Sequence, residues 1–173
     1  TLSSPEGRLQ TTVAADDALT YAVTFDGRPV LDASPLSLTL DDCTSWGVDP
    51  RVAGVSRTSV DAVIPSPFYR ADSLRERYNS LTLRMKDDWS VEFRAYDDAV
   101  AYRFVARQPG KVLVAGEEAR FRFAPGAVAF VPYVRDTPCR HDGLAFGEQF
   151  MQSFENTYTR TPLCEMDSAR LAF

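Results

Sequence analysis

The segment from Ser153 to Arg160 holds the side chains best suited to chemistry. It reads Ser-Phe-Glu-Asn-Thr-Tyr-Thr-Arg, so Glu155 stands beside an amide and between aromatic residues. Carboxylate and amide oxygens are the ligands that hard cations prefer, and they also accept hydrogen bonds from sugar hydroxyls. The same spacing is compatible with a solvated glutamate at a strand edge. Glu155 is therefore a candidate ligand, with the strand-edge interpretation as the alternative.

Adjacent acidic residues recur along the chain, at 16–17, 41–42, 87–88, 97–98 and 117–118. A glycosidase needs two carboxyl groups that face each other across a sugar, about 5–9.5 Å apart. Neighbouring side chains on a strand point to opposite faces, so adjacent acids do not form such a pair by themselves. We expect most of these pairs to lie in turns, and we assign no catalytic residue.

Histidine chemistry is excluded by count, because His141 is the only histidine. A histidine-based triad and a multi-histidine metal site both need more than this residue supplies. His141 lies in the polar segment 139–143 and is interpreted as a solvated loop residue. The sequence also lacks a Gly-x-Ser-x-Gly elbow, a His-Glu-x-x-His helix, a Walker loop and a glycine-rich dinucleotide turn.

The three cysteines, Cys43, Cys139 and Cys164, do not have the spacing of a metal site. Their number is odd, so at least one thiol is free or pairs between chains. Cys139 and Cys164 could pair if the protein is exported. We favour the other interpretation, in which the thiols are reduced and buried as small hydrophobic groups.

Aromatic residues make up 12% of the chain and could provide a stacking platform for sugar rings. The best candidates are Trp46 and the proline-rich loop 65–69, which contains Phe68 and Tyr69. For most of the aromatic residues we expect core packing instead. No substrate-binding residue is assigned.

Short alternating segments must position these side chains. In residues 91–104, Val91, Phe93 and Ala95 fall on one face and Glu92 and Arg94 on the other. This pattern, with a turn at 97–98, predicts an antiparallel hairpin with one buried face. Further strands are expected near 8–14, 19–25, 36–40, 52–60, 81–85, 121–123 and 128–134, the last interrupted by Pro132. Such spacing predicts an all-β, antiparallel sandwich or barrel.

Turns and ends support the same fold class. Asp26-Gly27 is a strong hairpin signal. Evidence for helices is thin, and only 72–78, capped by Asp72, is expected to form a short helical turn. Residues 169–173 look like the start of a further strand, which indicates a piece of a longer protein.

Length and charge narrow the function classes. A chain of 173 residues forms one large or two small domains and can bury a core. The net charge of −5 argues against a nucleic-acid partner, because a phosphate backbone would be repelled. No apolar run approaches the roughly 20 residues that span a bilayer, and no signal peptide is visible, so the sequence is compatible with a cytosolic protein or with a processed exported one.

Several motifs, in order, resemble the N-terminal domain of glycoside hydrolase family 97. They are "SPEGRL" at 4–9, "YAVTFDGRPVL" at 21–31, "VAGVSRTSVD" at 52–61, "RYNSL" at 77–81 and "EFRAYDDAVAYRF" at 92–104. In the segment that matches the family's "S-Y-E-x-x-Y", Glu155 and Tyr158 are kept and Phe154 replaces the tyrosine.

The resemblance implies a single β-sandwich of the mutarotase-like super-sandwich type over residues 1–173. It implies packing on a catalytic (β/α)₈ barrel of the same polypeptide, which is absent here. That barrel would hydrolyse α-glucosides or α-galactosides in an exo manner, from the end of the oligosaccharide, in the periplasm or outside the cell. It further implies that Glu155 reaches a calcium ion in the active site. Calcium takes six to eight oxygen ligands, so the barrel would supply the others. We expect the piece alone to be inactive; the alternatives are a stand-alone carbohydrate-binding module and a sandwich without a ligand.

Overall fold

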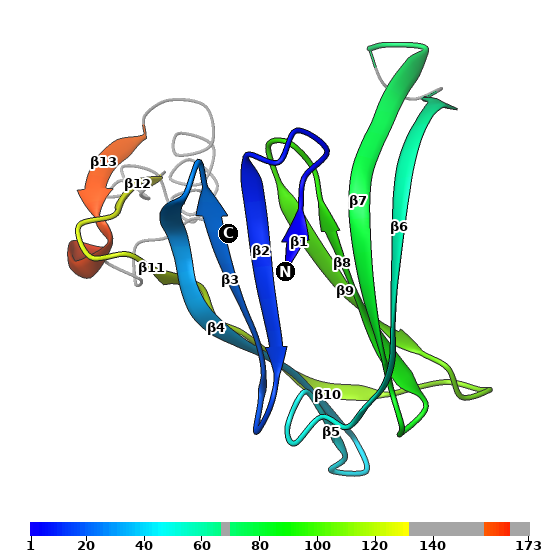
Figure 1. Ribbon diagram of the computed structural model, residues 1–173. Coiled ribbons are helices and arrows are strands. Elements are labelled where there is room, and N and C mark those ends of the chain that lie inside the picture. The colour runs from blue at the N-terminus through cyan, green and yellow to red at the C-terminus, as the bar shows by residue number, and fades with distance from the viewer. Residues whose placement is uncertain (67–69, 132–157, 167–173) are drawn as a thin grey trace, which may run out of the picture. The chain divides into compact units, whose positions relative to one another are not determined.

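The structure is a computed structural model that describes residues 1–66, 70–131 and 158–166 (Figure 1). The chain divides into two compact units, Thr1–Phe123 and Ala124–Phe173, which are considered separately. The described residues form β-strands and one short 3₁₀-helix, with no α-helix among them. The predicted all-β class is therefore confirmed.

The first sheet of the first unit is built around one long strand. Its strands are β1 (Leu2–Ser3), β2 (Leu9–Ala15), β3 (Leu19–Phe25), β4 (Arg28–Leu40), β5 (Ser45–Trp46), β10 (Val114–Ala119) and β11 (Arg122–Phe123). The main order is β1-β2-β3-β4-β10, with β5 and β11 also paired to β4. Residues 29–31 and the predicted strand 36–40 form one continuous strand, β4. Its register to β3 shifts at two points, and the strand continues through both.

A tight turn joins β3 to β4 where the sequence predicted it. Asp26 and Gly27 both have positive φ, at 48° and 75°. Two successive residues with positive φ match the twist of an antiparallel pair, which explains why Asp-Gly favours this hairpin. The turn fixes which side chains of β3 face inward, and Leu19, Tyr21 and Val23 are buried.

The second sheet has four strands in chain order: β6 (Val52–Pro65), β7 (Ser73–Met85), β8 (Trp89–Ala95) and β9 (Val100–Ala106). All neighbours are antiparallel. The predicted hairpin in 91–104 is confirmed, with Val91, Phe93 and Ala95 buried. The expected helical turn over 72–78 is wrong. Residues from Ser73 onward are extended because they pair with β6, starting with Ser73 opposite Pro65.

Side chains from both sheets meet in one core. Tyr21 of the first sheet contacts Phe93 of the second with 5.9 Å between ring centroids. Trp46 stacks on Trp89 at 5.6 Å, with the rings 7° from parallel. Alternating side chains on two facing sheets are what define a sandwich core. The first unit is therefore a β-sandwich, as predicted.

The second unit contains β12 (Val128–Val131), β13 (Thr159–Pro162) and a 3₁₀-helix, η1 (Leu163–Glu165). β12 and β13 pair antiparallel, from Val128 opposite Pro162 to Val131 opposite Thr159. The strand predicted at 128–134 is described only to Val131, and Pro132 lies outside the described residues. A single sandwich over all 173 residues stays a prediction. The described residues contain no helix long and apolar enough to cross a membrane.

Candidate functional site

The polar face of the second sheet carries a network of charged side chains. On β8 the residues at even positions, among them Glu92 and Arg94, point away from the buried Val91, Phe93 and Ala95. Arg103 on β9 lies opposite Glu92 in the register. The alternation that buries one face of the hairpin thus presents these charges together on the other face.

Glu92 is the centre of this group. It accepts hydrogen bonds from Arg94 Nε at 2.8 Å and Arg103 Nε at 2.7 Å. Burial raises its pKa, but the hydrogen bonds and charges of the two arginines outweigh that effect and hold the pKa of Glu92 below its usual range. Arg94 also donates to Glu76 at 3.2 Å and lies 4.3 Å from the Tyr78 ring centroid. Glu92 and Glu76 are thus linked to arginines in one network of ion pairs.

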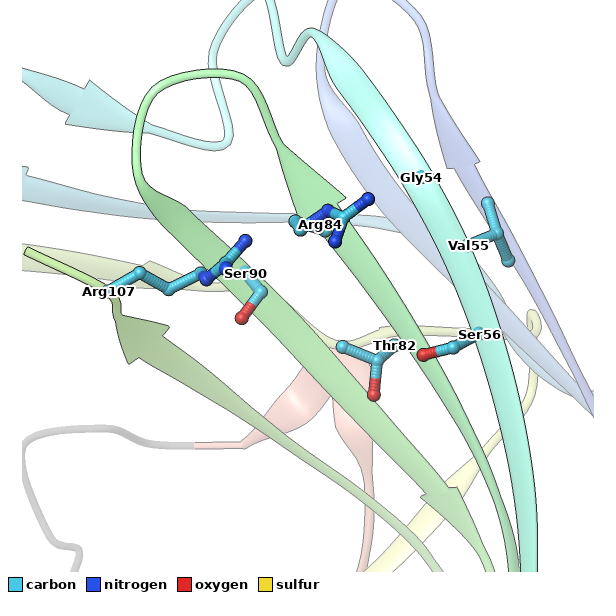
Figure 2. A pocket seen from close by; sticks show the side chains of 7 residues that line it. All are labelled: Gly54, Val55, Ser56, Thr82, Arg84, Ser90 and Arg107. Atoms are coloured by element: carbon cyan, nitrogen blue, oxygen red, sulfur yellow. The ribbon is translucent and has the colours of Figure 1, made fainter.

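Beside this network lies an open depression of about 340 Å³ between β6 and the end of β9. Arg84 of β7 and Arg107 both line it, together with the hydroxyl groups of Ser56, Thr82 and Ser90 (Figure 2). Neither arginine has an acidic partner among the described residues. Guanidinium and hydroxyl groups donate hydrogen bonds, so this surface has the chemistry to bind carboxylate oxygens.

Arg84 has a defined position in the depression because of Gly54. A Cβ atom at Gly54 would lie 2.9 Å from Arg84 Nη2. The missing side chain lets the guanidinium lie over the backbone of β6, and Figure 2 shows Arg84 directed towards that strand. Sequence reasoning missed this feature, although a glycine inside a strand often marks a close approach of another group.

None of the predicted site residues that the structure describes lies in the depression described above. Glu155, His141, Cys139, Phe68 and Tyr69 lie outside the described residues. Within the described ranges no group of three or more His, Cys, Asp or Glu side chains could hold a metal ion.

The prediction that Trp46 is an exposed stacking platform for sugars is wrong. The residue is only 5% exposed, and its ring is stacked on Trp89 in the core. The general expectation that aromatic residues pack in the core holds for it. The expected burial of the thiols is wrong for Cys43 and Cys164, which are exposed. Cys43 follows the end of β4 in a turn, with a positive φ of 68°.

The acidic pairs follow the expectation with one exception. The pairs at 16–17, 41–42, 87–88 and 97–98 lie in turns or bends between strands. Glu117 and Glu118 lie within β10.

Comparison with known proteins gives the family. The model of the glycosyl-hydrolase 97 N-terminal family matches residues 2–172. The chain belongs to this family. A retaining α-galactosidase of Bacteroides thetaiotaomicron is 49% identical over all 173 residues, and a probable retaining α-galactosidase of Streptomyces bingchenggensis is 33% identical over 140 residues. The chain spans only 26% and 21% of the lengths of these relatives.

Solved structures agree on the fold. A β-arabinopyranosidase matches 96% of this chain with a TM-score of 0.73 and 22% identity. A glycoside hydrolase family 97 enzyme from Pseudoalteromonas sp. strain K8, in complex with panose, matches 94% with a TM-score of 0.69 and 17% identity. The chain covers 27% and 24% of those two chains. The family 97 N-terminal fold is thus shared over almost the whole length of the chain.

Proposed function

We propose that this chain is the non-catalytic N-terminal β-sandwich of a retaining, exo-acting α-galactoside hydrolase. The observation that carries the proposal is the 49% identity over the full chain to a retaining α-galactosidase. The sequence alone left α-glucosides and α-galactosides equally open, and both curated relatives favour the galactoside. In this proposal the chain supplies neither a general acid nor a nucleophile.

In this proposal the chemistry belongs to a (β/α)₈ barrel elsewhere in the same polypeptide. About three quarters of the matched relative lies outside the aligned part, since the chain spans 26% of it. A remainder of that size has room for a barrel, which typically takes about 250 residues. The sandwich packs on the barrel, and the α-linked oligosaccharide is the substrate of the whole protein, in the periplasm or outside the cell.

Glu155 is the residue of this chain that we assign to the active site, as one oxygen ligand of a calcium ion. The support is the resemblance of Ser153–Arg160 to the family segment that carries such a glutamate. When bound, calcium would orient sugar hydroxyls and bias nearby carboxyl groups.

Calcium titration of the whole protein tests this assignment. Glu155→Gln removes the charge and keeps the size, so calcium affinity measured by calorimetry should fall by at least about tenfold. Losing a ligand or its orienting contact at a metal site typically costs 10–100-fold. Glu165→Gln, at an exposed glutamate in η1, is the matched control and should leave the affinity unchanged. Equal affinities for both variants and the wild type would remove Glu155 from the site.

A further inference from the structure

β6 is an unusually long free edge of the second sheet. It has 14 residues and stands at the end of the order β6-β7-β8-β9, paired only to β7 among the described residues. Natural edge strands are usually protected by short length, proline, lysine or bulges. Between Val52 and Ile64 the only charged residues are Arg57 and Asp61, and the only register shift lies at the start, between Val52 and Gly54. The rest of the edge is regular.

Nonpolar side chains of β6 are exposed on both faces of the sheet. Val55 (57% exposed) and Val63 (70% exposed) lie on one face, and Ile64 (40% exposed) lies on the other. Val55 lies opposite Leu83 in the register, and Leu83 belongs to the core. Opposite residues share a face, so Val55 stands at the open rim of the core. One more strand beside β6 would cover it.

The outer part of the hairpin formed by β6 and β7 has no other support from the sheet. Residues Ser73–Tyr78 pair with β6 only, because the register of β8 on β7 begins at Asn79. Figure 1 shows these two strands extending past the neighbouring β8. Ile64 and Leu74 face each other there, each 40% exposed. A two-stranded ribbon is at best marginally stable in water, so this part needs a further partner.

A positively charged side chain, Arg84, also lies at the free edge. The guanidinium of Arg84 reaches from β7 to Gly54 on the edge strand β6, and no acid pairs with it among the described residues. An aspartate or glutamate on a strand beside Gly54 would meet this guanidinium. Opposite charges on neighbouring strands stabilise a sheet.

We propose that a further β-strand of the parent polypeptide, from beyond these 173 residues, pairs with β6 and carries an acidic side chain that binds Arg84. The proposal rests on the proposed function in one respect, that the chain is part of a larger protein. The relative at 49% identity has about three quarters of its length outside the match, which supplies the segment. Main-chain hydrogen bonds to an exposed edge are a common mode of recognition.

Hydrogen exchange read by mass spectrometry tests the pairing. The 173-residue chain and the whole protein are compared under the same conditions. In the whole protein, peptides from residues 55–63 should exchange at least tenfold more slowly than in the 173-residue chain, while peptides from β8 change little. Equal exchange of β6 in the two proteins would overturn the proposal. Protection that grows with protein concentration would also overturn it, because a second copy would then be the partner.

Two charge-reversal variants of the whole protein test the contact. Arg84→Glu should return residues 55–63 to the faster exchange, because an acidic partner would be repelled. Arg107→Glu is the matched control: Arg107 lines the same depression but lies after β9, away from the free edge, so it should leave β6 protected. If the two variants behave alike, the acidic contact to Arg84 is refuted. These results do not depend on calcium binding by Glu155, so the two proposals can fail separately.

Discussion

At the scale of single residues, the core is decided by aromatic side chains that the alternating pattern directs inward. Phe93 is fully buried and contacts Tyr21 and Tyr102, with ring centroids 5.9 and 6.0 Å away respectively. The ring of Phe93 touches both sheets, so its removal leaves a cavity where the sheets meet.

Replacing Phe93 by alanine should lower the free energy of unfolding by about 3–5 kcal/mol, the usual cost of truncating a buried phenylalanine. Urea denaturation of the 173-residue chain, followed by fluorescence, measures this loss. Phe121→Ala is the matched control, because Phe121 is 55% exposed and its loss should cost under about 0.5 kcal/mol. Similar losses at both positions would contradict the core described here.

Glu92 gives the first unit a dependence on pH. In the unfolded chain its carboxyl titrates near the ordinary pKa of 4.5, and in the folded protein Arg94 and Arg103 hold that pKa lower. Its stabilising contribution is therefore complete above about pH 4.5 and is lost as the pH falls through the folded pKa.

Glu92→Gln should flatten the loss of stability between about pH 5 and pH 3, the range in which a depressed carboxyl pKa acts. Urea midpoints at several pH values measure the slope. Asp98→Asn, at an exposed turn position, is the control and should keep the slope of the wild type. A slope unchanged by Glu92→Gln would show that the two arginines do not stabilise this carboxylate.

Residue types predicted some of these positions and not others. Alternation was enough to assign Val91, Phe93 and Ala95 to the core, because a strand has only two faces. Alternation could not show whether Trp46 is buried, because its strand, β5, has only two residues and therefore no alternating pattern. Cys43 is exposed in a turn after β4, which a preference of thiols for the interior does not reveal.

At the scale of elements, turns and pairing decide what the strands become. Asp26-Gly27 predicted the β3–β4 hairpin because few residues tolerate positive φ. The segment 72–78 failed as a helical turn because its partner on β6 is distant in sequence, and only the fold shows that Ser73 lies opposite Pro65. Local signals therefore found the hairpins, and long-range pairing set the true length of β4, β6 and β7.

Gly27→Ala should destabilise the first unit by about 1–2 kcal/mol, the cost of a left-handed conformation for a residue with a Cβ atom. There is open space around Gly27, so the effect comes from the backbone alone. Gly116→Ala is the matched control: its surroundings are also open and its φ is not positive, so no loss is expected. Thermal unfolding of both variants measures the difference, and equal midpoints would contradict the turn geometry.

At the scale of the whole molecule, the chain belongs to the glycosyl-hydrolase 97 N-terminal family and spans 26% of the length of its 49%-identical relative. The order of its motifs predicted the family, because five short segments in sequence are more specific than any of them alone, and the family match over residues 2–172 confirms it. The active site could not be derived in the same way. Its candidate residue, Glu155, lies outside the described residues, and the other ligands and the reacting carboxyl groups would come from elsewhere in the polypeptide.

The central claim is that the reacting groups lie outside this chain. Its most direct test is hydrolysis of an aryl α-galactoside by the whole protein and by the 173-residue chain, at equal concentrations with calcium present. We expect turnover with retention of configuration by the whole protein and none by the 173-residue chain. Turnover by the 173-residue chain, or its absence in the whole protein, would contradict the account.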